Sequence, residues 1–418
     1  MRKHVFILQA IILLVFSAEI TLAAGLSDTG QTKCYDNTKE LTPCPAETET
    51  FYGQDAHYSY VQQSFTKLNE DGSVWTAGDP ENPNPPHVMV RDNVTGLIWA
   101  VETGGLYLWN DAKNYCEGLT IGDYSDWRMP TVNELRSIAR YEGSPFINTD
   151  YFPNTMAYIY WSSDKYDLLA YYRWYFDFDL GTSGYKKETK QPYYVRAVHC
   201  RETVCFFPPD YSSFIMTDNE NGTLTDIRTG LMWQQVWPSE YPIESPIGFD
   251  TSTTWDKAVE YCNGLSLAGF TDWRLPNIKE LASMVQLNAS PPSFLPKIQA
   301  DFYWSSTTGK STKSAITINF GFGTDLSPEK TDTTYGKYYV IAVRGGNYGT
   351  FAAKADLNRD SLVNLSDAII ALQVCGGMEP AVDTTFGMAN IDIDADLKIG
   401  MPEAIYILQE VAGIYRCL

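Results

Sequence analysis

The sequence predicts an α+β fold in which one domain occurs twice and a small all-α domain follows. The stretch "SDWRMPTVNEL" (125–135) returns as "TDWRLPNIKEL" (271–281), and the residues around it recur at a constant offset of 146 without an insertion, which indicates a duplicated domain. Each copy mixes short β-branched and aromatic runs with two helical patterns, which is typical of an α+β domain. Near the C-terminus, two acidic loops are each followed by a helical pattern.

The first 24 residues have the pattern of a secretory signal peptide. Arg2 and Lys3 precede the apolar run "VFILQAIILLVFSA", and the small residues of "TLAA" offer a cleavage site. The run is short for a membrane span, so an uncleaved anchor is the weaker alternative. We therefore expect a secreted protein, extracellular or at the cell surface, with the periplasm as a further compartment and with no membrane span after signal removal.

The formal net charge of −20 limits the classes of partner. Binding to phosphate backbones draws its affinity from Lys and Arg, so we expect no nucleic-acid partner. All eight cysteines lie beyond the signal segment and none forms a CxxC pair, which favours disulfides over thiol or zinc chemistry. We expect Cys34 to pair with Cys44 and Cys375 with Cys417. The pairing of the other four stays open: Cys116, Cys200, Cys205 and Cys262.

Composition and repeats divide the chain after residues 1–24 into four parts. Residues 25–86 are rich in turn residues and end in "GDPENPNPPH", which predicts a disulfide-pinned extension and a Pro-rich linker. The homologous domains cover 87–203 and 211–347, and the calcium-loop region covers 352–418. We expect recognition loops in the variable stretches within the two domains, 164–192 and 307–337, because irregular segments on a rigid scaffold usually carry binding.

The elements follow the same order in both domains. An opening strand precedes an amphipathic helix with a glycine placed for a left-handed C-terminal cap, and a second helix, a "YWSS" strand and a closing strand come next. The expected ranges are 95–99, 109–119, 160–163 and 193–198 in the first domain, and 229–233, 255–265, 303–306 and 338–343 in the second.

The repeated motif has two interpretations. Its arginine could grip an anion or a sugar, or the motif could be a scaffold in which Trp127 fills the core, Arg128 pairs with an acid and a Thr-x-x-Glu capping box starts the second helix. The cap pattern recurs in both copies, which favours the scaffold. The motif residues are Asp126, Trp127, Arg128 and Glu134, with Asp272, Trp273, Arg274 and Glu280 as their counterparts. We also expect Trp161 and Trp304 in the core rather than on a sugar platform.

The motif order resembles a known family. The succession TGL-x-W, a helix with "YC", "DWR-x-P", "YWSS" and "YYV-x-AV" resembles the Lcl C-terminal domain family, which takes its name from a bacterial collagen-like adhesin. That family is assigned to the C-type-lectin-like superfamily, so the resemblance implies two C-type-lectin-like domains. Related oxidase-like enzymes carry late cysteines where Ala197 and Ala342 stand here, which weakens an enzymatic interpretation.

Residues 356–367 have the ligand order of an EF-hand-type calcium loop. Ca²⁺ prefers six to eight oxygen ligands, and a second loop follows 36 residues later. The first loop offers Asp356, Asn358, Asp360, the Leu362 carbonyl, Asn364 and Asp367, and the second offers Asp392, Asp394, Asp396, the Lys398 carbonyl and Glu403. Gly400 at position 9 supplies no side-chain ligand, so we expect weaker binding in the second loop.

Two such loops with matching helices resemble a type I dockerin module, which implies Ca²⁺ as cofactor and a cohesin-like partner. We expect a binding or adhesion protein with a glycan or extracellular-matrix ligand and with no catalytic residues. The alternative is a component of extracellular polysaccharide degradation, either a glycoside hydrolase-type enzyme or its docked accessory. A glycosidase needs two facing carboxylates, and no local motif identifies such a pair.

Overall fold

The computed structural model describes eleven stretches of the chain: residues 26–58, 61–76, 86–166, 169–200, 216–226, 229–235, 253–287, 298–332, 338–345, 369–370 and 372–373. The expected signal peptide, Cys205, Cys375, Cys417 and both calcium loops lie outside the described residues. Among the described residues, no helix has the length and apolar character needed to cross a membrane.

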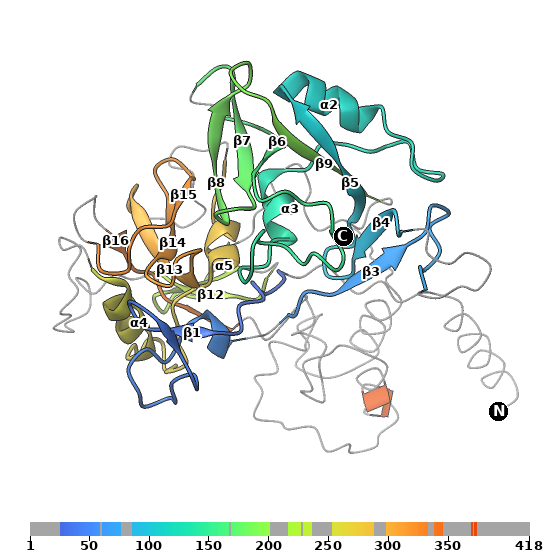
Figure 1. Cartoon of the computed structure of the whole chain (residues 1–418). Coiled ribbons are helices and arrows are strands. Elements are labelled where there is room, and N and C mark those ends of the chain that lie inside the picture. Colours follow the sequence, from blue (N-terminus) through green and yellow to red (C-terminus); the bar gives the residue numbers. More distant parts are fainter. Residues whose placement is uncertain are drawn as a thin grey trace, which may run out of the picture.

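The first homologous copy, unit 1, is built on one seven-stranded sheet of order β3-β4-β5-β9-β6-β7-β8 (Figure 1). Its pairings are antiparallel except for the parallel contact of β6 with β9. Helix α2 (Trp109–Glu117) lies over β5 and β9, and α3 (Val132–Ser137) faces the other unit. The strands are β3 (Phe65–Leu68), β4 (Met89–Asp92), β5 (Ile98–Tyr107), β6 (Ile159–Lys165), β7 (Tyr172–Asp177), β8 (Thr182–Lys187) and β9 (Tyr193–His199).

The second copy, unit 2, repeats these elements in two four-stranded sheets of order β10-β11-β12-β17 and β15-β14-β13-β16. Helices α4 (Trp255–Asn263) and α5 (Ile278–Ser283) correspond to α2 and α3. The strands are β10 (Met216–Asp218), β11 (Thr223–Asp226), β12 (Met232–Gln234), β13 (Phe302–Thr308), β14 (Ala315–Asn319), β15 (Asp325–Leu326), β16 (Tyr338–Tyr339) and β17 (Val343–Arg344).

The predicted α+β class is wrong. The described residues are mostly β-sheet with four short α-helices, and they include no all-α dockerin-like domain. The error came from stretches expected to be irregular loops. Residues 172–187 form the hairpin β7–β8, because Trp174 and Phe176 point toward the core at alternate positions, as strand residues do. The same applies in unit 2, where β14 and β15 fall inside the expected loop 307–337.

Both second helices start at a complete capping box. Thr131 accepts a hydrogen bond from the Glu134 backbone N–H while the Glu134 carboxylate accepts one from the Thr131 N–H, and Asn277 and Glu280 do the same in unit 2. The first helices end differently from the expectation. Gly118 and Gly264 close them in the right-handed region, at φ −91° and −86°, so the predicted left-handed caps are wrong.

The two units share one hydrophobic core. Helices α3 and α5 pack against each other near the centre of the molecule (Figure 1), and the largest buried cluster takes side chains from both units. Leu135 and Leu281, at matching positions of the two helices, are both fully buried. The apolar face of each short helix is therefore covered by its counterpart as well as by its own sheet.

Buried polar contacts cross this interface and differ between the two sides. The Arg136 guanidinium lies 2.7 Å from an Asp325 carboxylate oxygen, which also accepts a hydrogen bond from the Ser183 backbone N–H. The Lys279 ammonium donates to three oxygens, on Ser27, Asp28 and Ser137. Burial lowers the pKa of Lys279 to about 7, against the raising effect of Asp28. The duplicated halves have thus become complementary rather than identical.

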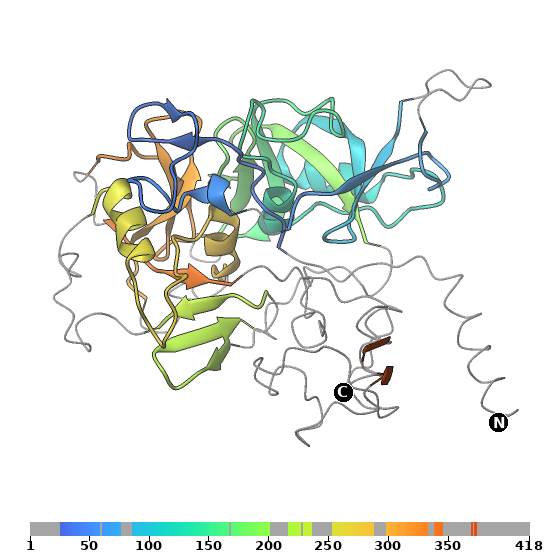
Figure 2. The same cartoon turned by 90° about the horizontal axis from the view of Figure 1, so that it is seen from below.

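An N-terminal extension, residues 26–58, lies mainly on unit 2 (Figure 2), and its first residues also contact unit 1 at Ser137 and Tyr141. It contains β1 (Cys34–Tyr35), β2 (Glu40–Leu41) and the 3₁₀ turn η1 (Asp55–His57), and a disulfide joins Cys34 to Cys44. The buried Asp55 carboxylate accepts hydrogen bonds from the Thr29 and Thr307 hydroxyls, at 2.9 and 2.5 Å. Burial, reinforced by the Asp28 charge, raises the pKa of Asp55 to about 8. The extension is therefore an integral part of the unit 2 structure.

Replacing Asp325 by Ala should lower the free energy of unfolding by about 3 kcal/mol, because it leaves the buried Arg136 charge without its partner. Urea unfolding monitored by tryptophan fluorescence measures the change. The matched control is Lys310→Ala, which removes another contact between the units, with Asp179, whose side chains are partly exposed. That variant should lose less than about 1 kcal/mol. Equal losses in the two variants would contradict the assigned role of the buried pair.

Asp55 predicts a pH dependence of stability. Its pKa is about 8 in the folded protein and about 4 in an unfolded chain, so between these values the folded state holds one more proton. Stability should therefore fall as pH rises from 5 to 7, by up to about 1.4 kcal/mol per pH unit from this group. Lys279 acts in the opposite sense and only above about pH 7, where its pKa is lowered from 10.5.

Urea unfolding at pH 5, 6 and 7 checks this against Asp55→Asn, which keeps an acceptor oxygen for Thr29 and Thr307. The free energy of unfolding of the variant should fall less steeply from pH 5 to pH 7 than that of the wild type, because the contribution of Asp55 is absent. Parallel stability profiles for the two proteins would refute the assignment.

Candidate functional site

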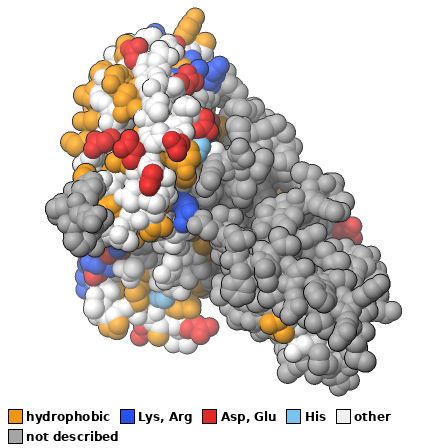
Figure 3. All heavy atoms as spheres, turned by 90° about the vertical axis from the view of Figure 1, so that its right-hand side faces the viewer, with side chains coloured by type: hydrophobic (Ala, Val, Ile, Leu, Met, Phe, Trp, Pro, Cys, Tyr) orange, Lys and Arg blue, Asp and Glu red, His pale blue; other side chains and the backbone are white. Residues whose placement is uncertain are grey.

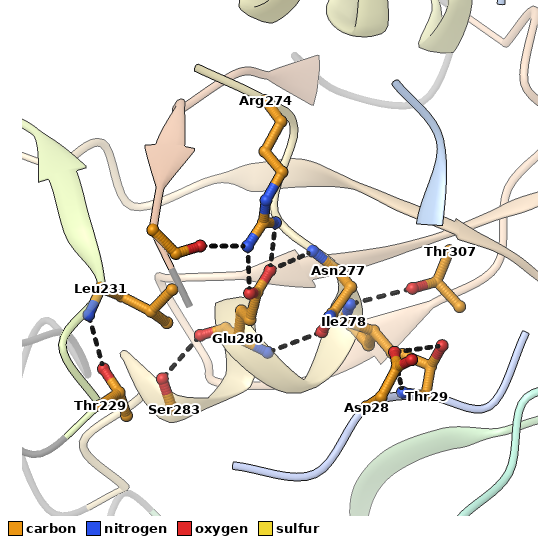
Figure 4. A network of polar contacts seen from close by, with 11 residues as sticks. Asp28, Thr29, Thr229, Leu231, Arg274, Asn277, Ile278, Glu280, Ser283 and Thr307 are labelled. Atoms are coloured by element: carbon orange, nitrogen blue, oxygen red, sulfur yellow. Dashed lines mark hydrogen bonds and ion pairs between the residues drawn. The ribbon is translucent and has the colours of Figure 1, made fainter. Parts of the chain in front are cut away.

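The repeated motif forms a closed ion pair in each unit. The Arg274 guanidinium donates to both Glu280 carboxylate oxygens, at 2.7 and 2.5 Å, and the same carboxylate caps α5 (Figure 4). In unit 1, Arg128 makes the equivalent contacts with Glu134, at 2.8 and 2.6 Å. Trp127 and Trp273 are buried beside these pairs. The Arg and Glu groups therefore neutralise each other's charge, and the Glu carboxylate also accepts a hydrogen bond from the backbone at the start of the helix.

The aspartate of each motif is tied to the closing strand. Asp126 contacts the His199 ring nitrogen Nδ1 at 2.7 Å, and Asp272 contacts Arg344 at 2.7 Å. Each partner also lies against an aromatic ring at matching positions, which are Tyr124 for His199 and Phe270 for Arg344. Both aspartates keep most of their surface exposed. The motif thus joins the second helix to the end of the sheet in both units.

The remaining thiols are unsuited to nucleophilic chemistry. Cys116 and Cys262 are free and buried in α2 and α4. Burial raises the pKa of Cys116 to about 12 and raises that of Cys262 as well, so neither forms a thiolate near neutral pH. Cys200 is disulfide-bonded. Among the described residues, the group that could hold a metal ion is Cys34, Cys44 and His57, but the two sulfur atoms are consumed by the disulfide.

In each unit a cationic side chain lies over the tryptophan at the start of the first helix. The two cationic residues stand at positions of the repeat that are not equivalent. In unit 1 the Arg173 guanidinium lies 4.5 Å from the Trp109 ring and pairs with Glu188. In unit 2 the residue aligned with Glu188 is Lys330, whose ammonium lies 3.9 Å from the Trp255 ring. Lys330 donates to the Asp36 carbonyl of the extension, and burial lowers its pKa to about 7.

The extension covers one face of unit 2 and leaves the corresponding face of unit 1 open. Figure 1 shows β1 beside α4, with no described segment in the same place beside α2. The last residues of β13 are fully buried, whereas the last residues of the matching strand β6 become progressively exposed. The side chain of Arg274 is 2% exposed and that of Arg128 is 37% exposed. The two copies of one surface therefore differ in cover.

We call this uncovered surface of unit 1 the open face. Leu169 and Tyr171 project from the loop between β6 and β7 with 46% and 62% of their surface exposed, and Leu108, before α2, is 37% exposed. The exposed side chains of Lys165 and Lys186 flank them, from the end of β6 and from β8. The open face is defined by these residues: Leu108, Lys165, Leu169, Tyr171 and Lys186.

Backbone contacts hold the apolar part of the open face together. The Glu188 N–H donates to the Tyr171 carbonyl at 2.8 Å, and the Trp109 N–H donates to the Glu188 carbonyl at 3.4 Å. Leu108 and the Tyr171 loop are therefore neighbours although they are far apart in sequence. Tyr171 has φ +70°, a left-handed conformation that is uncommon for a bulky residue and that is found where surrounding structure imposes it.

Figure 3 views the molecule from the side on which α2 lies. The described part of that surface mixes hydrophobic and acidic side chains with a smaller number of Lys and Arg, in keeping with the net charge of −20. Exposed lysines without an acidic partner are therefore informative about which ligands the open face would attract.

Sequence reasoning placed the motif residues and the buried Trp161 and Trp304 but missed the polar groups between the units. Arg136, Lys279 and Lys330 occupy helix and loop positions that look like solvent-facing charges in the sequence. The available signal was their failure to repeat, since the aligned positions carry Ala282, Asn133 and Glu188. Arg136 and Lys279 make contacts between the units, and Lys330 makes one with the extension, that the aligned residues do not make.

Comparison with known proteins supports the duplication. The model of the Lcl C-terminal domain family matches residues 88–199 and again residues 222–344, and the two matches together span more than half of the chain. A search of curated proteins found no match. The matched ranges fall on units 1 and 2, each with its motif helix and closing strand. The chain belongs to the Lcl C-terminal domain family and carries that domain twice.

Proposed function

We propose that this is a secreted binding and adhesion protein, in which the open face of unit 1 recognises a glycan or extracellular-matrix ligand and the C-terminal tail docks with the help of calcium. The observation that carries the proposal is that the extension covers this surface in unit 2 but not the equivalent surface in unit 1. In unit 2 that surface is occupied by the extension, and in unit 1 it exposes Leu169 and Tyr171. Exposed large apolar side chains that cluster on a rigid scaffold favour a binding surface.

Binding is favoured over catalysis because the chemically suggestive groups are already engaged. The motif Arg and Glu groups neutralise each other, and the free thiols have raised pKa values. The alternative function, a role in extracellular polysaccharide degradation, draws support from the two calcium-loop patterns of the tail. Release of reducing sugar from a soluble polysaccharide, abolished by a single carboxylate substitution, would establish that alternative.

For the tail, the proposal rests on sequence patterns alone. Residues 356–367 and 392–403 would each hold Ca²⁺ through clustered oxygens, and neutralising those carboxylates would allow the tail to fold and to dock onto a cohesin-like partner. A relationship to the C-type-lectin-like superfamily, through the family resemblance, would fit a glycan ligand. The expected location is the extracellular space or the cell surface.

The recognition surface can be tested with Tyr171→Ala combined with Leu169→Ala. The full chain is screened in calcium against an immobilised panel of glycans and extracellular-matrix proteins. The double variant should bind the identified ligand at least about tenfold more weakly, because it removes most of the exposed apolar surface. The matched control is Phe322→Ala, which removes a side chain of similar exposure, 52%, from a turn of unit 2.

The control variant should bind as the wild type does. Absence of binding to every panel member, or an equal loss in the control, would sink the proposed recognition role.

Calcium binding can be tested by titration calorimetry and scanning calorimetry of the full chain. Calcium should bind to two sites of unequal affinity, and a chelator should lower the temperature of one unfolding transition, because binding to the folded state stabilises it. Asp356→Ala with Asp360→Ala should remove the tighter site. A thermogram unchanged by chelator would refute the calcium proposal.

A further inference from the structure

The way unit 2 holds the extension shows what kind of ligand this surface accepts. Three side chains of unit 2 donate to main-chain carbonyls of the extension: Asn263 to Tyr52, Thr312 to Thr38 at 2.8 Å, and Lys330 to Asp36 at 3.0 Å. Gln31 of the extension in turn bonds both the N–H and the carbonyl of Thr308. Phe51 stacks on Trp255. The surface therefore binds a polypeptide segment rich in turns through its main-chain carbonyls and one aromatic anchor.

Unit 1 provides the acceptor at the start of its second helix without the extension. Asp164 is aligned with Thr307 and accepts the α3 backbone N–H of Val132 at 2.6 Å, while in unit 2 Thr307 accepts the N–H of Ile278 and passes the contact to Asp55. A second copy of the extension would bring its Asp55 carboxylate against Asp164. The threonine hydroxyl that Asp55 contacts in unit 2 is absent there, so the open face does not offer residues 26–58 the same contact.

The loop at the open face has changed from polar to apolar. Unit 2 has "GKSTKS" at 309–314, whose Thr312 holds the extension, and unit 1 has "YDLLAYY" at 166–172. Among the described residues of this loop, Leu169 and Tyr171 are exposed. A polar loop that contacts polypeptide main chain has thus been replaced by one that offers aliphatic and aromatic contact.

The charge of the open face is positive in an otherwise acidic protein. The ammonium groups of Lys165 and Lys186 form no ion pair with any described residue, and Lys186 lies 5.7 Å from the Tyr175 ring. The neighbouring Arg173 does not add to this charge, because Glu188 neutralises it. Two lysines that pair with no described acidic residue, beside an apolar strip, favour a ligand that carries both carboxylate and apolar groups.

We infer that the open face of unit 1 binds a peptide segment of a partner protein, with apolar side chains against Leu108, Leu169 and Tyr171 and a carboxylate toward Lys165 and Lys186. This inference rests on the proposed recognition function and names its ligand class. A peptide fits better than a sugar for two reasons. The homologous surface of unit 2 already binds polypeptide, and two of the three apolar contact residues are leucines, which offer no ring for sugar stacking.

The test is selection of peptides from a displayed random 12-residue library on the full-length protein in calcium. Selected peptides should be enriched in apolar residues together with Asp or Glu, and synthetic versions should bind with measurable affinity by fluorescence anisotropy. Tyr171→Ala with Leu169→Ala should weaken that binding at least about tenfold, and Phe322→Ala should leave it unchanged. Repeating the selection on the double variant Lys165→Glu, Lys186→Glu should reverse the preferred charge of the peptides.

The outcomes separate this inference from the proposed function. If glycans bind and lose affinity in the Tyr171 and Leu169 double variant while no peptide is selected at that face, the peptide inference is overturned and the recognition role stands. If selected peptides bind all variants equally, the inference is also overturned. If neither peptides nor panel ligands bind, both proposals fail. Unchanged thermal unfolding of each variant ensures that a loss of binding is not a loss of fold.

Discussion

The packing of α3 against α5 is the constraint on which the rest of the structure depends. Each helix has only six residues, too few to be stable alone, and each gains stability from a capping box and from burial against its counterpart. Because the two helices come from the two copies, neither unit completes its core without the other. The duplication has therefore produced one joint hydrophobic core, with an Arg136–Asp325 ion pair between the units, rather than two domains with separate cores.

Once the copies share a core, they are free to diverge at matching positions. The cation over the helix tryptophan comes from Arg173 in unit 1 and from Lys330 in unit 2, and the acceptor at the start of the second helix is Asp164 in one and Thr307 with Asp55 in the other. In both cases the same contact is kept, a cation over the tryptophan or an acceptor for the helix N–H, but a different residue makes it. In unit 2, Lys330 and Thr307 also contact the extension, through Asp36 and Asp55, whereas the equivalent surface of unit 1 has no such covering.

The sequence by itself was sufficient for features that depend on neighbours along the chain. Both first helices begin where the pattern predicted, at Trp109 and Trp255, and both capping boxes form, because these features need only a few adjacent residues. The constant offset between the copies predicted the repeated domain, and the family match shows it. The fold class failed because aromatic hairpin strands such as 172–187 read as irregular loops when their partner strands are unknown.

What only the tertiary structure decided is which of two similar surfaces is covered. The sequence determined that the chain carries one motif twice, with the same Trp, Arg, Pro and Glu in each copy. It could not show that residues 26–58 cover the α4 side of unit 2 while their first residues reach unit 1 at Ser137 and Tyr141, because that placement depends on contacts such as Asp55 with Thr307, 252 positions apart. Burial of Thr308 and exposure of Lys165 follow from that placement, and so does the location of the open face.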